Sequence, residues 1–267
     1  MMDYTLLIPT HCVKAGTGEI CPWAPSTKLI ETSIDSVFKY AFYDIKPKKV
    51  VVAHDYKEGM AICDDYHANL QALCSRRGYQ LQKNSVSDWR TNFIGSFTNN
   101  FINLYDSMKT ELGLLLEHDW VFTKQIDLSN ISDLFKTFDI INHLRFNWHI
   151  NDNNHLWTRR QDHRRSVLYD FIETRTNHRV IKTDVFSNNP HIIRKSAYHS
   201  LLRRFMIMSI PSYGPIEGPI QAVFDSMTHH TNNDYKTCLD SLGYCLYGSY
   251  GEGNHVDHLD SNKYRII

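Results

Sequence analysis

Short apolar runs alternate with helix-periodic segments through the first half of the chain, and this alternation constrains the fold more than any other feature. The apolar runs cover residues 4–9, 49–53 and 112–117, with a shorter one at 79–81. Between them, residues 28–43, 64–78 and 93–108 have apolar side chains at helical spacing. A βαβαβαβ order predicts a mostly parallel sheet with helices on both faces. The expected fold class is therefore α/β.

The second half of the chain is less regular. It predicts a helix within 126–138, a strand within 140–148, a strand at 180–186, and helices at 196–206 and 218–226. The Asn-Pro pair at 189–190 predicts a turn over 186–191. Residues 188–194 are interpreted either as a loop beside a substrate or as the entry turn of the following helix. Neither an internal repeat nor a low-complexity segment divides the sequence. We therefore expect one continuous domain.

Charge and cysteine content narrow the class of protein. The sequence has 29 Lys and Arg against 29 Asp and Glu, so the chain has no net positive charge that would attract nucleic acid or an anionic membrane. We expect no signal peptide, because the first residues lack a basic region followed by a long apolar one, and we expect no membrane-spanning helix, because no apolar stretch is long enough. The 6 cysteines include no CxxC pair, which favours free thiols in a reducing compartment. We expect a soluble, cytoplasmic protein.

Polar side chains follow three of the expected strands at the point where each ends. Thr10 and His11 follow the first strand, Asp55 follows the second, and Glu-His-Asp at 117–119 ends the fourth. In open α/β sheets ligands bind outside the carboxyl ends of the strands, so these side chains are expected to converge on one crevice. Buried acids cost free energy unless their charge is compensated, and a metal ion is one compensator.

These features resemble the GT-A class of nucleotide-sugar-dependent glycosyltransferases, and the likeness covers nearly the whole chain. The resemblance implies a GT-A-like, Rossmann-like single domain in which residues 1–122 bind the nucleotide sugar and residues 123–267 bind the acceptor. Nine residues match positions that contact the nucleotide in that family: Pro9, Thr10, His11, Asp55, Arg90, Gly95, Asn99, Glu117 and His118.

The family ends its fourth strand with a short acidic metal motif, usually Asp-x-Asp, and Glu117-His118-Asp119 is a variant of it. The resemblance implies that Asp119 binds Mn²⁺ or Mg²⁺, while Glu117 contacts the ribose or a metal-bound water. A C-terminal histidine often completes the metal shell in this family. His258 resembles that ligand, with His255 as its competitor.

An acid between Gly214 and Pro219 resembles the base that inverting GT-A enzymes place over the acceptor. Inverting transfer needs a group that takes the proton of the attacking hydroxyl, and Glu217 is the expected base. The alternative is an acid favoured by the dipole at a helix start. Asp184 and Asp257 are the next candidates.

The sequence therefore predicts a metal-dependent, inverting glycosyltransferase. Its expected partners are a nucleoside diphosphate sugar, with UDP favoured, and a hydroxyl of a glycan or other acceptor; neither nucleic acid nor a transmembrane segment is expected. A sugar nucleotidylyltransferase is one alternative, although the loop at residues 10–26 lacks the Gly-rich, basic phosphate signature of those enzymes. A non-catalytic carbohydrate-binding protein on the same fold is the other.

Overall fold

The structure is a computed structural model, and it describes most of the chain. The described residues are 2–13, 18–86, 93–151, 171–173, 179–183, 186–209, 235–249 and 251–259. Arg90, Asp184 and Glu217, together with the helix predicted at 218–226, lie outside them.

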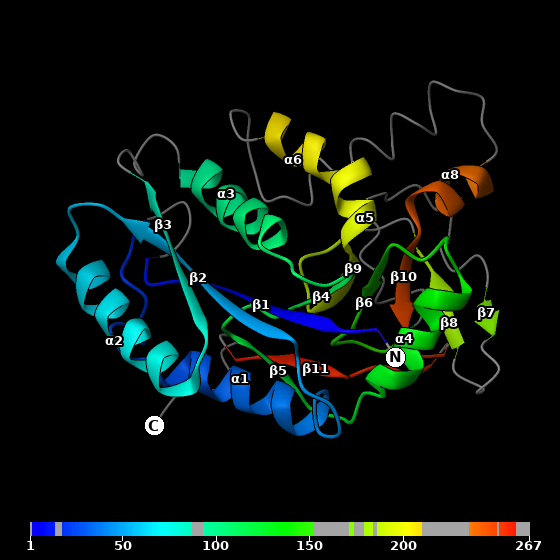
Figure 1. The fold of residues 1–267 in the computed structure, drawn as a ribbon, viewed down its shortest axis with the longest axis horizontal. Helices are drawn as coiled ribbons and strands as arrows, with labels where there is room; N and C mark the ends of the chain where they lie inside the picture. Colours follow the sequence, from blue (N-terminus) through cyan, green and yellow to red (C-terminus); the bar gives the residue numbers. More distant parts are fainter. Residues whose placement is uncertain are drawn as a thin grey trace.

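A nine-stranded sheet in the order β3-β2-β1-β4-β9-β6-β10-β8-β7 runs through both halves of the chain (Figure 1). Its strands are β1 (Tyr4–His11), β2 (Lys49–Lys57), β3 (Gln80–Val86), β4 (Leu112–Leu115), β6 (His143–Arg145), β7 (Phe171–Glu173), β8 (Arg179–Lys182), β9 (His191–Arg194) and β10 (Tyr244–Tyr247). The first four strands pair in parallel, β3 with β2, β2 with β1 and β1 with β4. Of the remaining five, only β9 and β8 run against the common direction. The expected mostly parallel central sheet is confirmed.

Helices cover both faces of the sheet, as the alternating order predicts (Figure 1). One face carries α1 (Lys28–Tyr40), α2 (Ala61–Arg77) and α4 (Leu128–Thr137). The other carries α3 (Phe93–Asp106), α5 (Lys195–Ala197), the π-helix η1 (Tyr198–Leu202), α6 (Arg203–Ser209) and α8 (Tyr235–Leu242). Gly78 ends α2 in the left-handed conformation with φ +69°, which glycine adopts without steric cost.

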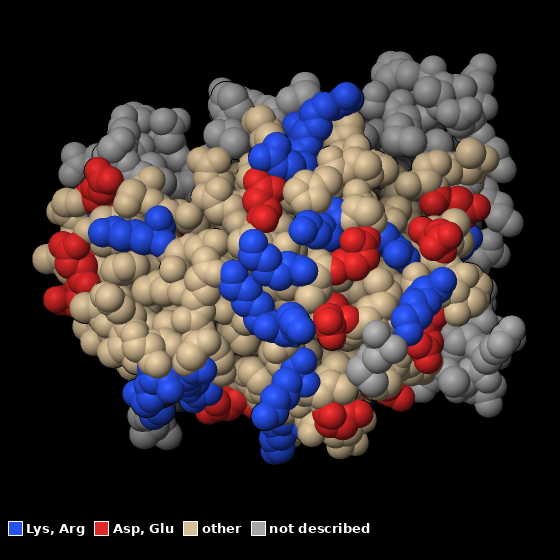
Figure 2. All heavy atoms as spheres, viewed as in Figure 1, with Lys and Arg blue, Asp and Glu red and all other residues tan. Residues whose placement is uncertain are grey.

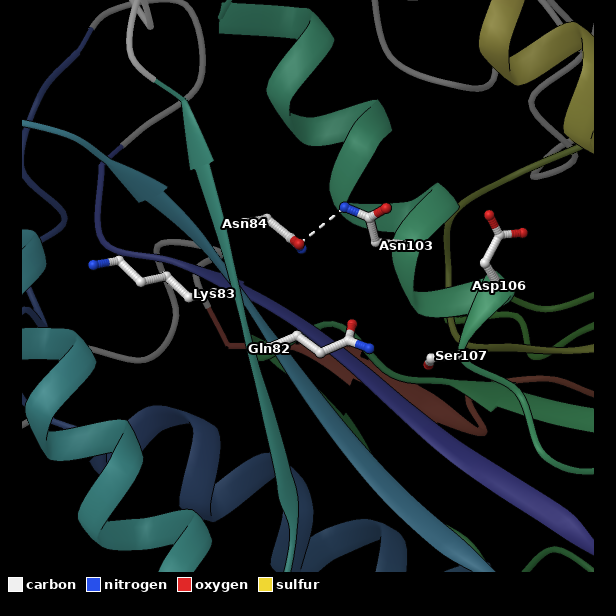
Figure 3. A pocket seen from close by; sticks show the side chains of 6 residues that line it. All are labelled: Gln82, Lys83, Asn84, Asn103, Asp106 and Ser107. Atoms are coloured by element: carbon white, nitrogen blue, oxygen red, sulfur yellow. Dashed lines mark hydrogen bonds between the residues drawn. The ribbon is translucent and has the colours of Figure 1, made fainter.

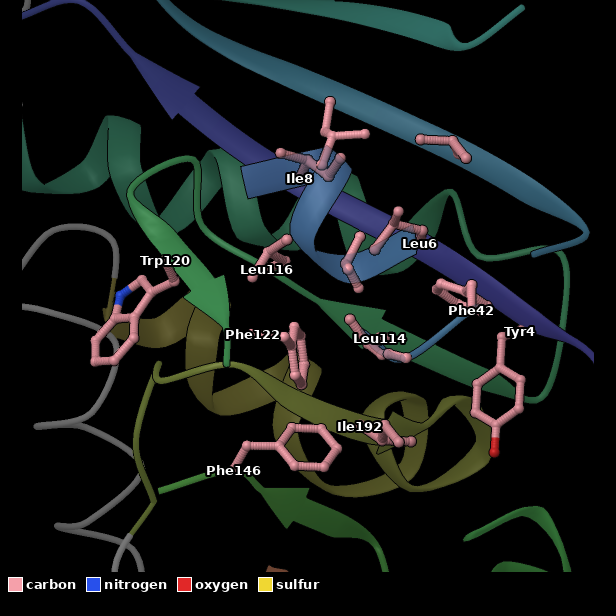
Figure 4. Close-up of a cluster of buried hydrophobic side chains, with 14 of the residues drawn as sticks. Tyr4, Leu6, Ile8, Phe42, Leu114, Leu116, Trp120, Phe122, Phe146 and Ile192 are labelled. Atoms are coloured by element: carbon pink, nitrogen blue, oxygen red, sulfur yellow. The ribbon is translucent and has the colours of Figure 1, made fainter. Parts of the chain in front are cut away.

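Alternation along the strands divides the interior into two layers, because successive side chains of a strand point to opposite faces. Leu6 and Ile8 pack into the layer beneath α1, which we call the α1-side core, whereas Leu7 packs into the layer beneath α3, the α3-side core. Figure 4 shows the α1-side core, where Leu114 and Phe122 lie among side chains of β1 and β9. Because both faces of the sheet are buried, the sequences of these strands are unbroken apolar runs.

A second, two-stranded sheet joins the middle of the sequence to its C-terminal segment. In it β5 (Trp120–Phe122) pairs in antiparallel fashion with β11 (Val256–His258), and His258 lies opposite Trp120. Neither strand was predicted, because each has only three residues and depends on the other for its hydrogen bonds. This pairing carries the C-terminal segment to the end of β4.

Several predictions about the strands are wrong. The first strand does not end at residue 9 but continues to His11, so Thr10 and His11 lie within β1. Residues 191–194 are not a loop but β9, a strand between β4 and β6 that pairs with both. Ile192 and Ile193 are fully buried there. The strand was missed because four residues directly after an Asn-Pro turn are too few to show the alternation typical of a strand. The second strand does not end at residue 53. It continues to Lys57 because β3 pairs with it along its whole polar end, so Asp55 lies within a strand.

The surface carries charges of both signs. Figure 2 shows Lys and Arg side chains in a band across one face with Asp and Glu side chains beside them. None of the described helices is both long and apolar enough to cross a membrane.

Candidate active site

The acidic motif forms the turn between β4 and β5. Trp120 N–H donates to the carbonyl oxygen of Glu117 at 3.1 Å, and the hydroxyl of Ser33 in α1 donates to the carbonyl oxygen of His118 at 2.6 Å. These bonds hold the turn against α1. Because β4 pairs in parallel with β1, the turn lies at the carboxyl end of the parallel strands, where α/β folds bind their ligands.

Asp119 contacts the C-terminal strand. Its Oδ2 lies 3.2 Å from Nε2 of His258, and its carbonyl oxygen accepts a bond from Leu259 N–H at 2.7 Å. The Asp119 side chain is buried, yet Oδ1 has no hydrogen-bond partner among the residues that the structure describes. Burial of a carboxylate oxygen without a hydrogen-bond partner costs free energy, so this atom is suited to bind a cation.

The two candidate C-terminal histidines have different surroundings. The ring of His258 packs on Trp120 with centroids 4.8 Å apart, while its Nε2 faces Asp119. His255 is buried against Tyr247, and its Nε2 lies 3.4 Å from Oε1 of Glu252. The structure thus favours His258 over His255 as the partner of Asp119.

Aromatic and imidazole rings surround the acidic turn. The His118 ring lies 4.6 Å from the His11 ring and 5.4 Å from the Trp23 ring, measured between centroids. Burial, reinforced by the charge of His118, lowers the pKa of His11 to about 3, so His11 is neutral at pH 7. Trp23 was not predicted to belong to the site. Its position between two prolines in the loop after β1 was the available signal.

Asp119 is ionised in this environment. Burial alone raises the pKa of its carboxyl group, but the charge of His118 and the hydrogen bond from His258 outweigh that effect. The pKa of Asp119 is therefore held well below its usual range. An ionised carboxylate is the form that a metal ion requires.

Glu117 has different neighbours from Asp119. Its negative charge contributes, after burial and the charge of Tyr198, to raising the pKa of Tyr105. The Tyr105 hydroxyl belongs to the α3-side core and lies 2.9 Å from Nε2 of His191. Glu117 is thus near α3 and β9, whereas the contacts of Asp119 run to β11. The joint metal role of these two acids stays a prediction.

The residues of β1 and β2 that were predicted to bind the nucleotide contact other side chains of the protein. Thr10 shares a 2.7 Å hydrogen bond with the Tyr66 hydroxyl in α2. Asp55 pairs with His11 in the register of the sheet, and its Oδ2 lies 2.7 Å from Nζ of the buried Lys57. Asp55 therefore lies beside the site, but its carboxylate is already paired with the ammonium group of Lys57.

The other predicted residues are dispersed. Pro9 is buried within β1, and Gly95 and half-buried Asn99 lie in α3. Asp257, an alternative base, is half-buried in β11 and accepts a hydrogen bond from the backbone N–H of His258 at 2.9 Å. Together with the residues above, this leaves His11, His118, Asp119 and His258 as the predicted residues that the structure brings together. The mostly parallel sheet with helices on both faces is the α/β architecture that the sequence predicts.

A polar groove lies between β3 and α3. Figure 3 shows its lining, in which Asn103 Nδ2 donates to Asn84 Oδ1 at 2.9 Å. The six lining residues are Gln82, Lys83, Asn84, Asn103, Asp106 and Ser107. None of them is among the predicted site residues.

No protein-family model and no curated protein matches the chain. It is similar to crystal structures of S. aureus TarS 1–349, alone and in complex with UDP, at 14% and 15% identity with TM-scores of 0.47 and 0.48. Each comparison covers 94% of this chain and 59% of the TarS chain. The bifunctional IspDF from Campylobacter jejuni is 12% identical with a TM-score of 0.43, over 96% of this chain and 52% of that one. The chain thus spans little more than half of these proteins, and the scores are too low to support a function.

Proposed function

We propose that the chain is a glycosyltransferase that moves a sugar from a nucleoside diphosphate donor, with UDP favoured, to a hydroxyl of a glycan or other acceptor. One observation carries the proposal. Asp119 stands at the carboxyl end of the parallel strands with a buried oxygen that lacks a described partner and a C-terminal histidine in contact. A buried acid in that position suits the recognition of a metal-bound diphosphate.

The residues present fit a divalent cation. Asp119 Oδ1 would hold Mn²⁺ or Mg²⁺ on the protein side. His258 would add an imidazole ligand, which suits Mn²⁺ better, through a ring nitrogen that does not donate to Asp119. When bound, such an ion neutralises the charge of the diphosphate as it leaves. Asp119 contributes by staying ionised at neutral pH, and neutral His11 adds no repulsion toward a cation.

The transfer step is proposed to invert the anomeric carbon, with Glu217 as the base. In that step the acceptor oxygen bonds to the anomeric carbon, the bond to the diphosphate breaks, and Glu217 takes the hydroxyl proton. Glu217 lies outside the described residues, so the support for its role is the Gly-Pro-Ile-Glu-Gly-Pro segment of the sequence.

A panel of UDP-, GDP- and CDP-sugars incubated with Mn²⁺ tests the proposal. We expect release of a nucleoside diphosphate from one donor, and loss of this release in Asp119→Asn. Asp35→Asn is the matched control because Asp35 is an exposed acid of α1 that pairs with Arg77. Pyrophosphate release from a nucleoside triphosphate and a sugar phosphate would instead indicate a nucleotidylyltransferase. Sugar binding without turnover of any donor would indicate a carbohydrate-binding protein.

A further inference from the structure

Two cysteines and a histidine converge at the ends of the first two strands. Cys12 directly follows β1, His54 lies in β2 and Cys63 lies in the first turn of α2; all three side chains are fully buried. Their ligand atoms lie within 4.8 Å of one another, and among the described residues no other group of three His, Cys, Asp or Glu side chains is this compact. The two Sγ atoms are 2.9 Å apart, and His54 Nε2 is 3.7 Å from Cys12 Sγ.

His54 is oriented as a ligand by a second histidine. Its Nδ1 lies 3.2 Å from Nδ1 of His67, and the two rings are stacked. With the proton on His54 Nδ1, this atom donates to His67 and leaves the lone pair of Nε2 directed at the sulfurs. Metal-binding histidines are commonly held in this way, by a hydrogen bond from the other ring nitrogen. A metal-binding imidazole is neutral, and the full burial of His54 favours that form.

The two sulfurs lie close enough to share a hydrogen bond, with Cys12 Sγ and Cys63 Sγ 2.9 Å apart. Cysteine binds metal as thiolate, so a soft cation would displace the protons of this pair.

Geometry and charge indicate which occupant fits. In a tetrahedral zinc site, bond lengths of about 2.3 Å to sulfur and about 2.0 Å to nitrogen separate neighbouring ligand atoms by about 3.5 to 3.8 Å. The separation of Cys12 Sγ and His54 Nε2 already has this value, and the two sulfurs would open by about 0.8 Å. A disulfide would need them to close by a similar amount, to about 2.05 Å, and would give His54 Nε2 no cation to bind. Two thiolates, a neutral imidazole and Zn²⁺ have no net charge, which suits full burial.

We propose that Cys12, His54 and Cys63 bind a zinc ion. The ion would join the end of β1 to β2 and α2, next to the hydrogen bond between Thr10 and Tyr66. This site differs in chemistry from the one at Asp119, because sulfur ligands select zinc whereas carboxylates suit Mg²⁺ and Mn²⁺. It does not depend on the glycosyltransferase proposal.

Metal analysis of the full chain, purified under reducing conditions without chelator, tests the proposal. We expect one zinc ion per chain, lost in Cys63→Ser and in Cys12→Ser. Cys74→Ser is the matched control, since Cys74 is a buried cysteine of the same helix outside the cluster, and it should retain the zinc. Replacement of zinc by Co²⁺ in the parent protein should produce a sulfur-to-cobalt charge-transfer band. This readout needs no variant, so it stands even if the serine variants do not fold.

Chelation provides a second measurement. A strong zinc chelator should lower the melting temperature of the parent and of Cys74→Ser, but not that of a folded Cys63→Ser. Parent protein that contains no zinc and takes up no Co²⁺ would overturn the proposal. If peptide mapping of that protein shows a bond between Cys12 and Cys63, the pair is a disulfide instead; if both thiols react with an alkylating agent after unfolding, the cluster is a packing contact only.

Discussion

Nε2 of His258 lies 3.2 Å from Oδ2 of Asp119, although the two residues come from opposite halves of the sequence. The pairing of β11 with β5 creates this contact, because it sets His258 opposite Trp120, the residue after Asp119. The contact helps to keep Asp119 ionised, and it leaves the other carboxylate oxygen without a described partner. One antiparallel pairing thus assembles the candidate metal site.

Asp119→Asn should abolish Mn²⁺-dependent binding of a nucleoside diphosphate, and His258→Ala should weaken it. The reason is that Asn removes the negative charge that a cation needs, whereas loss of His258 removes one neutral ligand. Isothermal calorimetry of UDP with and without Mn²⁺ checks this, with Asp35→Asn as the control. Unchanged affinity in Asp119→Asn would place the metal elsewhere.

Glu217→Gln should leave folding and donor binding near normal while it reduces transfer at least about 100-fold, since glutamine keeps the shape but cannot accept the proton. A helix-start acid would instead cost about 0.3 to 1 kcal/mol of stability and spare the chemistry. Initial transfer rates at saturating donor distinguish these outcomes. Transfer within a few fold of the parent rate would move the search for the base to Asp184 or Asp257.

His191 should make the protein sensitive to mild acid. Burial lowers the pKa of its imidazole to about 4, and both ring nitrogens are engaged, Nδ1 with the carbonyl of Asn189 at 2.8 Å and Nε2 with the Tyr105 hydroxyl at 2.9 Å. The unfolded chain takes up this proton at about pH 6.5, so the folded state is favoured above that pH. Between about pH 6.5 and about pH 4 the free energy of unfolding should fall by about 1.4 kcal/mol per pH unit for this group.

Urea unfolding at about pH 7 and about pH 5 measures this effect. His191→Gln should lose about 2 kcal/mol less stability between these conditions than the parent. His199→Gln is the control, because His199 is exposed on η1 and should lose as much as the parent. Equal losses in the parent and His191→Gln would show that His191 is protonated in the folded state.

Gly243→Ala should destabilise the protein more than Gly78→Ala. Both glycines have positive φ, +63° and +69°, which costs an alanine about 1 to 2 kcal/mol. A Cβ at Gly243 would also lie 1.9 Å from the carbonyl oxygen of Ile140, whereas a Cβ at Gly78 meets nothing within 4 Å. We expect the alanine at Gly243 to cost at least about 1 kcal/mol more in urea unfolding. Equal costs would mean that the turn before β10 shifts to make room.

The first half of the fold follows from local sequence pattern. The runs that became β1, β2 and β4 are apolar on both faces because helices cover both, and the intervening segments have one apolar stripe each. Such patterns need only a few consecutive residues to be recognised. The order of strands and helices, and the position of Glu117-His118-Asp119 after β4, are therefore readable from the sequence.

The remaining features depend on contacts between distant residues. β9 is a strand because it pairs with β4 on one side and with β6 on the other. β5 and β11 are strands because they form hydrogen bonds with each other. The zinc-ligand candidates Cys12, His54 and Cys63 have no metal-site spacing, since three separate elements bring them together. Sequence pattern by itself determined which segments form the parallel sheet; tertiary packing decided which side chains meet at its carboxyl ends, because burial and pairing act between segments whose separation along the chain carries no local signal.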